Sequence, residues 1–195
     1  NSEAVIGGIM RDLGIRDELW VATKVDREDR QGGIERMENS FELLGGDSFE
    51  LIQVHNLRGS AIQLETMRAW QEQGRFRYIG VTTSSDRQYD AMAEIMENNE
   101  LQFIQVDYSL GNRNVADRIL PLAADKGLAV LVNLPFGRGR LFSAVGDRSL
   151  PDWAGDIDAT SWAQVFLKYV MSHPATTIPI PGTTKSHHAE DNIAA

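Results

Sequence analysis

Two stretches, Leu19-Trp-Val-Ala-Thr-Lys24 and Leu51-Ile-Gln-Val-His55, decide the fold class of this chain. Each is a short apolar run that ends on a titratable side chain. In parallel α/β enzymes the active site lies at the carboxyl ends of the strands, so Lys24 and His55 are candidate active-site residues. A plainer interpretation stays open for each residue taken alone. Lys24 fits a strand-end lysine that extends toward solvent, and His55 fits a hydrogen-bonded core imidazole.

Strand-like and helical segments alternate along the whole chain. Strands are expected at 20–25, 51–56, 78–83, 103–109, 128–135 and 176–181, and helices at 32–45, 62–74, 86–99, 115–126 and 160–173. Strict alternation with short connections predicts repeated βα units and a parallel sheet. No Gly-x-Gly-x-x-Gly motif follows an early strand, which weakens the case for an open dinucleotide-binding sheet.

The pattern within the strands favours a barrel. Polar side chains stand at alternate strand positions (Gln53 and His55, Gln105 and Asp107), as the interior of a (β/α)8 TIM barrel allows. Such a barrel needs roughly 200–250 residues, so we expect one partial domain over residues 1–195 with the first two strands missing. The segment 136–158, rich in Gly, Arg and Asp, is predicted to be a substrate loop, with a surface insertion as the alternative.

Composition excludes several classes of protein. The chain has 195 residues, 42% of them hydrophobic, which suits a single core, and its net charge of -9 argues against nucleic acid as a partner. It has no cysteine, so no disulfide or thiolate metal site is expected, and a reducing, cytoplasmic location fits. No run is apolar enough for a membrane span. The chain opens on a helix N-cap, Asn1-Ser-Glu, so we expect something to precede it, and an export signal stays open.

Six motifs, in order and spacing, resemble the aldo-keto reductase family, in a bacterial branch. They are Thr23-Lys24, Ile52-Gln-Val-His55-Asn, Tyr78-Ile-Gly-Val-Thr82, Phe103-Ile-Gln105-Val-Asp-Tyr, Pro135-Phe-Gly137 and Ile180-Pro-Gly-Thr-Thr-Lys185 with Asp191-Asn192. The resemblance implies a barrel that binds NADPH, with NADH less favoured, and reduces a small-molecule aldehyde or ketone to an alcohol. Neither the substrate nor the oligomeric state follows from it.

The resemblance assigns catalytic roles to Lys24 and His55. Lys24 matches a lysine whose ammonium lowers the pKa of a proton-donating tyrosine. His55 matches a histidine that orients the carbonyl. The family's tyrosine and aspartate have no match, because the four tyrosines of this chain lie on later elements. We expect an N-terminal truncation rather than a degenerate member, and no catalysis by the family mechanism from the 195 residues alone.

The resemblance also implies a set of cofactor-binding residues. Thr82, Thr83 and Gln105 would hold the nicotinamide carboxamide, and Asn133 replaces the aromatic residue that usually stacks on the ring. The pyrophosphate loop matches Leu134, Pro135, Phe136, Gly137 and Arg138, with a flexible turn as the alternative. The adenosine end, including the 2′-phosphate, matches Thr183, Thr184, Lys185, His188, Asp191 and Asn192.

Two further interpretations of the same residues remain. Lys24 at a strand end also suits a Schiff-base aldolase, and the departures from the family pattern suit a non-catalytic nicotinamide-binding or scaffold barrel. The pair His187-His188 invites a metal site, but adjacent residues on a helix face apart and no third ligand is evident. No metal is therefore expected.

Overall fold

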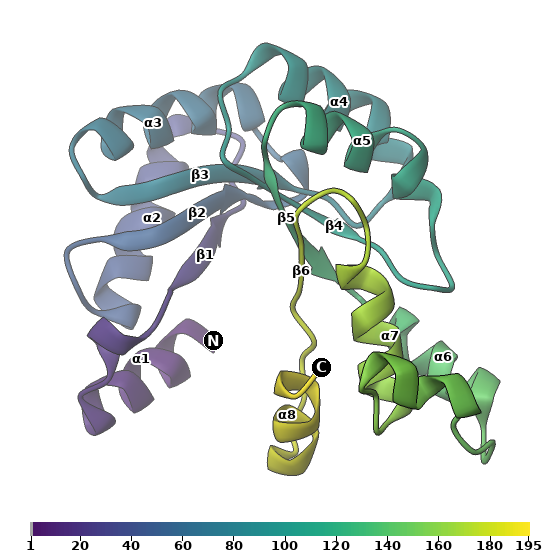
Figure 1. The fold of residues 1–195 in the computed structure, drawn as a ribbon. Helices are drawn as coiled ribbons and strands as arrows, with labels where there is room; N and C mark the ends of the chain where they lie inside the picture. The colour runs from purple at the N-terminus through teal and green to yellow at the C-terminus, as the bar shows by residue number, and fades with distance from the viewer. Residues whose placement is uncertain (1) are drawn as a thin grey trace. The chain divides into compact units, whose positions relative to one another are not determined.

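The computed structural model describes residues 2–195, so the expected N-cap at Asn1 lies outside the described residues. Figure 1 shows the strands and helices alternating as the sequence predicts. The strands are β1 (Ala22–Val25), β2 (Phe49–Val54), β3 (Phe76–Thr82), β4 (Phe103–Asp107), β5 (Ala129–Asn133) and β6 (Thr177–Pro179). The α-helices are α1 (Ser2–Leu13), α2 (Arg30–Leu44), α3 (Ser60–Glu72), α4 (Tyr89–Asn98), α5 (Ile119–Asp125), α6 (Arg140–Val145), α7 (Trp162–Met171) and α8 (Ser186–Ile193).

The fold is a parallel α/β fold whose six strands follow chain order in the sheet. β1 pairs with β2, β2 with β3, and β5 with β6, all in parallel. The predicted fold class is confirmed in the part of the chain that the structure describes. Two compact units divide the chain, and each is considered by itself. Unit 1 runs to Thr83 and includes Glu100–Phe103, and unit 2 comprises Ser84–Asn99 and Ile104–Ala195.

An aromatic cluster closes the amino-terminal ends of two strands in unit 1. Phe49 and Phe76, the first residues of β2 and β3, surround Phe41 of α2, with Phe41 and Phe49 stacked at 4.3 Å between ring centroids. The guanidinium of Arg75 lies 3.6 Å from the centroid of the Trp70 ring. These large buried rings stabilise the strands at the end opposite their carboxyl termini, which leaves the carboxyl ends available for a site.

The segment 136–158 of unit 2 differs from the loop that the sequence predicts. The segment 136–158 is not a plain loop, because it contains α6 and a 3₁₀ helix, η6 (Asp152–Ile157). Its apolar residues pack with the start of α7 in a separate hydrophobic cluster, formed by Phe136, Leu141, Val145, Leu150, Ala154, Ala159, Trp162, Val165 and Phe166. The sequence did not predict this burial, because a segment rich in Gly, Arg and Asp is typical of an exposed loop. No helix in residues 2–195 is long and apolar enough to cross a bilayer.

Candidate functional site

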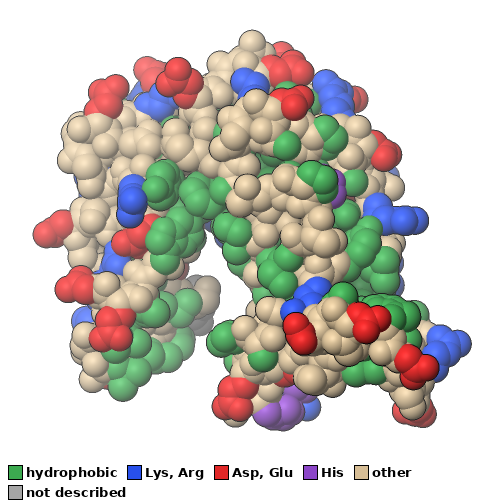
Figure 2. Space-filling model, viewed as in Figure 1, with side chains coloured by type: hydrophobic (Ala, Val, Ile, Leu, Met, Phe, Trp, Pro, Cys, Tyr) green, Lys and Arg blue, Asp and Glu red, His purple; other side chains and the backbone are tan. Residues whose placement is uncertain are grey.

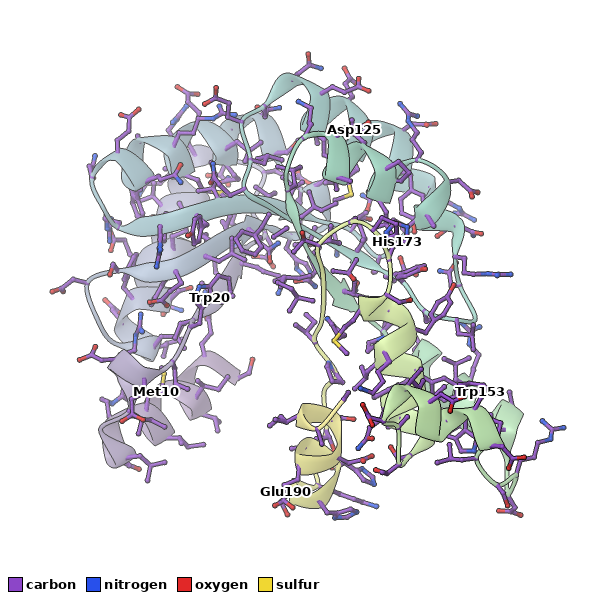
Figure 3. All side chains as sticks on the ribbon, in the orientation of Figure 1. Met10, Trp20, Asp125, Trp153, His173 and Glu190 are labelled. Atoms are coloured by element: carbon purple, nitrogen blue, oxygen red, sulfur yellow. The ribbon has the colours of Figure 1, made fainter. Side chains whose placement is uncertain are left out.

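Lys24 and His55 line the same cleft in unit 1, which has a volume of about 470 Å³. Lys24 is in register with Gln53 of the neighbouring strand, and His55 directly follows the last residue of β2. The parallel register therefore brings the two side chains to one edge of the strand pair. Trp20 and Met10, labelled in Figure 3, also line the cleft.

Helix α1 gives the cleft a partly apolar wall. Ile6 and Met10 line it, and the helix also carries several exposed hydrophobic side chains, which Figure 2 shows gathered over α1 at the lower left. The most exposed of them are Val5, Ile6, Ile9 and Leu13. The Lys24 ammonium and the His55 imidazole therefore lie beside apolar side chains, and apolar surroundings disfavour the charged form of both groups.

A left-handed turn places His55. The prediction that the strand extends through Asn56 is wrong by two residues, because β2 ends at Val54 and His55 begins a 3₁₀ turn, η2 (His55–Leu57). Asn56 and Leu57 have φ values of 53° and 58°, and the N–H of Asn56 donates to Thr82 Oγ1 at 3.1 Å. Residues other than glycine rarely adopt positive φ, and such positions concentrate at functional sites.

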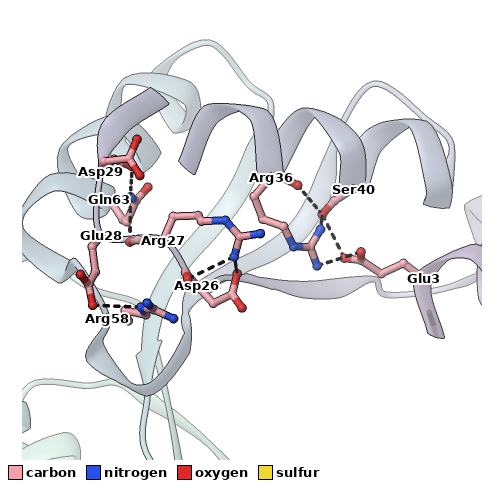
Figure 4. A network of polar contacts seen from close by, with 9 residues as sticks. All are labelled: Glu3, Asp26, Arg27, Glu28, Asp29, Arg36, Ser40, Arg58 and Gln63. Carbon is pink, nitrogen blue, oxygen red and sulfur yellow. Dashed lines mark hydrogen bonds and ion pairs between the residues drawn. The ribbon is translucent and has the colours of Figure 1, made fainter. Parts of the chain in front are cut away.

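The loop after β1 and the loop after β2 are tied together (Figure 4). Gln63 Nε2 donates to the carbonyl oxygens of Arg27 at 3.0 Å and Asp29 at 2.9 Å. Gly59 has φ +65°, and a Cβ there would lie 2.3 Å from the Arg27 carbonyl oxygen. Arg58 pairs with Glu28 at 3.1 Å. Close backbone approach therefore fixes the loop that carries His55 against the strand end that carries Lys24.

Burial sets the charge states of the two candidates. Burial lowers the pKa of Lys24, and the negative charge of Glu3 opposes that shift. The pKa of His55 is lowered mainly by burial and also by the positive charge of Lys24, with Asp26 opposing. The neutral imidazole is therefore favoured at neutral pH, and a neutral imidazole still has one N–H to donate.

Glu3 is a site residue that sequence reasoning missed. Its side chain is only 14% exposed; one oxygen pairs with Arg36 at 2.9 Å, and the other accepts from Ser40 Oγ at 3.0 Å and from Thr23 Oγ1. Figure 4 shows Glu3 reaching from α1 to α2. Its partners lie 20 to 37 residues away along the chain. No sequence motif signals contacts of that range.

Thr82 and Thr83 lie at the carboxyl end of β3, and both are buried. Thr82 Oγ1 accepts the Asn56 N–H. That hydroxyl therefore helps to hold the His55 turn, and its own proton is still able to donate.

Two strands of unit 2 carry a buried side-chain oxygen without a partner among the described residues. Gln105 of β4 is 8% exposed, and its Oε1 accepts no hydrogen bond within the protein. Asn133, the last residue of β5, has a buried Oδ1 that also accepts no hydrogen bond within the described residues. Buried acceptors are nearly always satisfied, so these two oxygens are suited to accept from the amide group of a ligand.

The loop after β5 has an unusual backbone. Leu134, Gly137, Arg138 and Gly139 have φ values of 54°, 57°, 57° and 83°. The N–H of Gly137 donates to the Leu134 carbonyl at 2.8 Å, and that of Gly139 to the Phe136 carbonyl at 3.0 Å. These two amides are occupied within the turn. In this conformation the exposed Arg138 is left as the source of positive charge for a phosphate.

The carboxyl-terminal segment of unit 2 forms a second cavity, of about 430 Å³. Phe136 and Phe142, with ring centroids 5.0 Å apart, line it together with Thr183, His188 and Asn192. Thr183 Oγ1 accepts from the Lys185 N–H at 3.1 Å. Thr184 and Lys185 are exposed and do not line the cavity. The aromatic pair therefore shares a cavity with Thr183, His188 and Asn192, three of the residues expected at the adenosine end of the cofactor.

Asp191 is committed to contacts within the protein. Its carboxylate accepts from Ser161 Oγ at 2.7 Å and from Gln164 Nε2 at 2.8 Å. Gln164 Oε1 in turn accepts the Thr160 N–H at 2.8 Å. Asp191 therefore anchors α8 to the start of α7. The pattern Ser161-x-x-Gln164 resembles a capping box, and that signal was available in the sequence.

The two adjacent histidines, His187 and His188, do not face apart as predicted, because their ring centroids lie 4.4 Å apart, edge to face. No group of three or more His, Asp or Glu side chains positioned for a metal ion occurs in the part of the chain that the structure describes.

The tyrosines of this chain lie outside the Lys24 cleft. Tyr89 donates to Asp107 Oδ1 at 3.2 Å, and Tyr108 donates to the Tyr169 hydroxyl at 3.2 Å. Burial raises the pKa of Tyr89 and of Tyr108, with nearby acceptors adding to the shift. Among the described residues, no tyrosine lines the cleft.

Comparison with known proteins identifies the family. The aldo-keto reductase YhdN of Bacillus subtilis is 29% identical over 153 residues, which are 72% of this chain and 45% of that protein. The aldo-keto reductase str7 of Strobilurus tenacellus is 24% identical over all of this chain and 69% of its own length. A solved aldo/keto reductase of Klebsiella pneumoniae, in complex with NADP and acetate, matches 98% of the chain with a TM-score of 0.78 and 24% identity.

A thermostable aldo-keto reductase, Tm1743, matches with a TM-score of 0.75 and 22% identity. The chain spans 45% of the length of the Bacillus relative and about 70% of the two solved chains. The model of the Aldo/keto reductase family matches residues 1–195. The chain therefore belongs to the aldo/keto reductase family.

Proposed function

We propose that the protein is an NADPH-dependent oxidoreductase that reduces a small aldehyde or ketone to an alcohol. The observation that carries the proposal is the shared cleft of Lys24 and His55 at the carboxyl ends of two neighbouring parallel strands. Family membership supports it, as does the presence of NADP in the solved Klebsiella pneumoniae relative.

In this proposal the two side chains act on the carbonyl oxygen. NADPH, when bound, supplies the hydride. The His55 N–H donates to the oxygen as negative charge develops on it, and a donor that is already in place stabilises that charge. The Lys24 ammonium adds positive charge from the neighbouring strand. No tyrosine of the described chain lines the cleft, so the oxygen takes the proton that completes the alcohol from water.

Each unit, considered by itself, carries candidate cofactor-binding residues. An amide presents both donors and an acceptor, so the hydroxyls of Thr82 and Thr83 in unit 1 suit the nicotinamide carboxamide. In unit 2 the unpartnered oxygens of Gln105 and Asn133 suit an amide for the same reason. Phosphate groups suit the exposed cations of this unit, Arg138 and Lys185, and the exposed hydroxyls of Thr183 and Thr184. For the pyrophosphate we assign Leu134, Pro135, Phe136, Gly137 and Arg138, and for the adenosine end Thr183, Thr184, Lys185, His188 and Asn192, with Asp191 acting through the anchoring of α8.

One observation favours a second candidate. Burial lowers the pKa of Lys24, and a lysine with a lowered pKa is a better nucleophile for Schiff-base chemistry. Borohydride treatment in the presence of a carbonyl compound distinguishes the two functions. A mass increase on Lys24 would indicate the aldolase, and an unmodified Lys24 agrees with the reductase.

Cofactor binding provides the direct test. We expect tryptophan fluorescence of the intact protein to be quenched by NADPH. Lys185→Ala should weaken NADPH binding roughly 10-fold, the size of one lost charge-assisted hydrogen bond, and should leave NADH binding unchanged. Lys126→Ala is the matched control, since Lys126 is also exposed in unit 2 but lies in the turn after α5. Absence of NADPH binding by folded protein would refute the proposed function.

A further inference from the structure

Lys24 occupies a position that disfavours its positive charge. The side chain is largely buried, and burial lowers its pKa. The charged and titratable groups around it come from four elements: Glu3 of α1, Asp26 just after β1, Arg36 of α2, and His55 of η2, all of which line the same cleft. Arg36 is cationic and His55 is favoured as neutral, so only the two carboxylates are able to offset the cost of burying the ammonium.

The two carboxylates differ in their surroundings. Asp26 has a side chain that is 42% exposed and pairs with the neighbouring Arg27 at 2.5 Å, so solvent screens its charge. Glu3 is 14% exposed and is held at three points, by Thr23, Ser40 and Arg36. A fixed charge in a less polar setting acts more strongly on its neighbours. Glu3 is therefore the carboxylate with more influence on Lys24.

Glu3 also contacts the lysine strand directly. Its Oε1 accepts from the hydroxyl of Thr23, the residue before Lys24 in β1. The same oxygen accepts from Ser40 Oγ, and Oε2 pairs with Arg36, so one carboxylate links α1, β1 and α2. Movement of the first turn of α1 would therefore move both the strand end and the negative charge of Glu3, which opposes the lowering of the Lys24 pKa.

We propose that Glu3 is a positioning residue for Lys24: its carboxylate fixes the end of β1 through Thr23 and keeps the Lys24 side chain in the cleft as an ammonium. In its bearing on carbonyl reduction this inference rests on the proposed function, which needs the ammonium. Its test needs neither turnover nor cofactor.

The titration of Lys24 can be followed directly by NMR of intact protein labelled with ¹³C-lysine. The chain has four lysines, at positions 24, 126, 168 and 185, and Lys24→Arg assigns the signal by its disappearance. We expect Glu3→Gln, which removes the charge and keeps an oxygen acceptor, to shift the Lys24 midpoint to lower pH. The other three midpoints should not move. Glu3→Asp keeps the charge, so its Lys24 midpoint should lie between the midpoints of the wild type and Glu3→Gln.

Glu50→Gln is the matched control in the same unit. Glu50 is also a partly buried carboxylate, 25% exposed and paired with Arg16 at 3.4 Å, and it accepts the Val21 N–H at 2.6 Å, but it does not line the cleft. We expect it to leave the Lys24 midpoint unchanged. An equal shift in Glu50→Gln and Glu3→Gln would overturn the inference, because the effect would then be a general one of loosening unit 1.

Arg36→Gln tests the same idea with the opposite sign, which matters if Glu3→Gln does not fold. Arg36 neutralises part of the Glu3 charge and is itself a cation in the cleft. Its removal should therefore shift the Lys24 midpoint to higher pH. A folded Glu3→Gln protein with the wild-type midpoint, or Arg36→Gln with a midpoint that does not rise, overturns the inference. Failure to bind NADPH with these titrations intact would count against the proposed function alone.

Discussion

The cleft of unit 1 and the carboxyl-terminal segment of unit 2 are held in different ways. Around Lys24 and His55, side chains far apart in sequence meet: Glu3 contacts Thr23 and Ser40, and Thr82 accepts from the backbone beside His55. In the segment 182–185, every residue is exposed. The polar contact there is local, from the Lys185 N–H to the Thr183 hydroxyl.

This difference matches the different demands of the two proposed roles. A group that stabilises developing charge must be placed to within about 0.5 Å, which requires support from packed neighbours. A group that binds a phosphate can be a long, exposed side chain that orders when the ligand arrives, at a modest cost in side-chain entropy. The contrast predicts that substitutions in the cleft affect the reaction and that those in the segment 182–185 affect cofactor affinity.

The largest expected effect is on turnover. Lys24→Met should lower the rate of para-nitrobenzaldehyde reduction by the intact protein by about 10²- to 10³-fold, the usual contribution of one group that stabilises developing charge. NADPH affinity should change little, because the substitution lies in the cleft. Lys168→Met is the control, since Lys168 is also a half-buried lysine but lies in α7. The oxidation of NADPH measures the rate, and equal losses in both variants would contradict the role of Lys24.

The next effect is on stability, and it tests how the His55 loop is held. Gly59 and Gly74 both have positive φ, but a Cβ at Gly59 would lie 2.3 Å from the Arg27 carbonyl, whereas a Cβ at Gly74 meets nothing within 4 Å. Gly74→Ala should cost about 1 kcal/mol for its left-handed backbone alone. Gly59→Ala should cost about 3 kcal/mol, because overpacking is added. Urea denaturation measures both costs. Equal costs would mean that the loop after β2, which carries Gly59, is not in close contact with the loop after β1, which carries Arg27.

Much of the fold follows from the sequence, because the alternation of apolar strands and amphipathic helices is strong. The strand ends were less predictable. The strand predicted at 51–56 extends past Val54, yet the backbone turns into the left-handed region at Asn56 and Leu57. That turn depends on Thr82, which is 26 residues away. Helix α6 was missed for a similar reason, since its residues are stabilised by packing on Phe166 rather than by a strong local pattern.

The candidate site divides in the same way. Lys24 and His55 were found because each follows an apolar strand, and the cleft brings them together as expected. Glu3 was missed because its role depends on how α1 packs against β1 and α2. Asp191 was assigned to the adenosine end, but its carboxylate is occupied by Ser161 and Gln164. Residue type and position predict which groups are candidates, while tertiary contacts decide which of them are available.

The smallest expected effect concerns pH and compares one histidine from each unit. Burial lowers the pKa of His55 in unit 1 and of His173 in unit 2 from the ordinary value of 6.5. His173 also uses its Nδ1 to accept the Ala175 N–H at 3.1 Å, which only the unprotonated nitrogen can do. A neutral histidine is therefore favoured in each folded unit.

The sign of the effect follows from linkage. Because the unfolded chain takes up protons at these sites at higher pH than the folded chain, the free energy of unfolding should be unaffected above about pH 7 and should decrease as the pH falls through 6.5 toward the folded pKa values. Protonation of carboxylates also changes the free energy of unfolding at low pH, so each histidine variant is compared with the wild type at the same pH. His173→Gln should reduce the loss of stability between pH 7 and pH 5 (about the range in which histidine titrates) more than His55→Gln does. His55 is exposed to solvent, which screens its charge, whereas protonation of His173 also breaks a hydrogen bond. Urea unfolding of the three proteins across this range measures the difference, and a larger effect for His55→Gln would show that the cleft is less accessible to water than its exposure indicates.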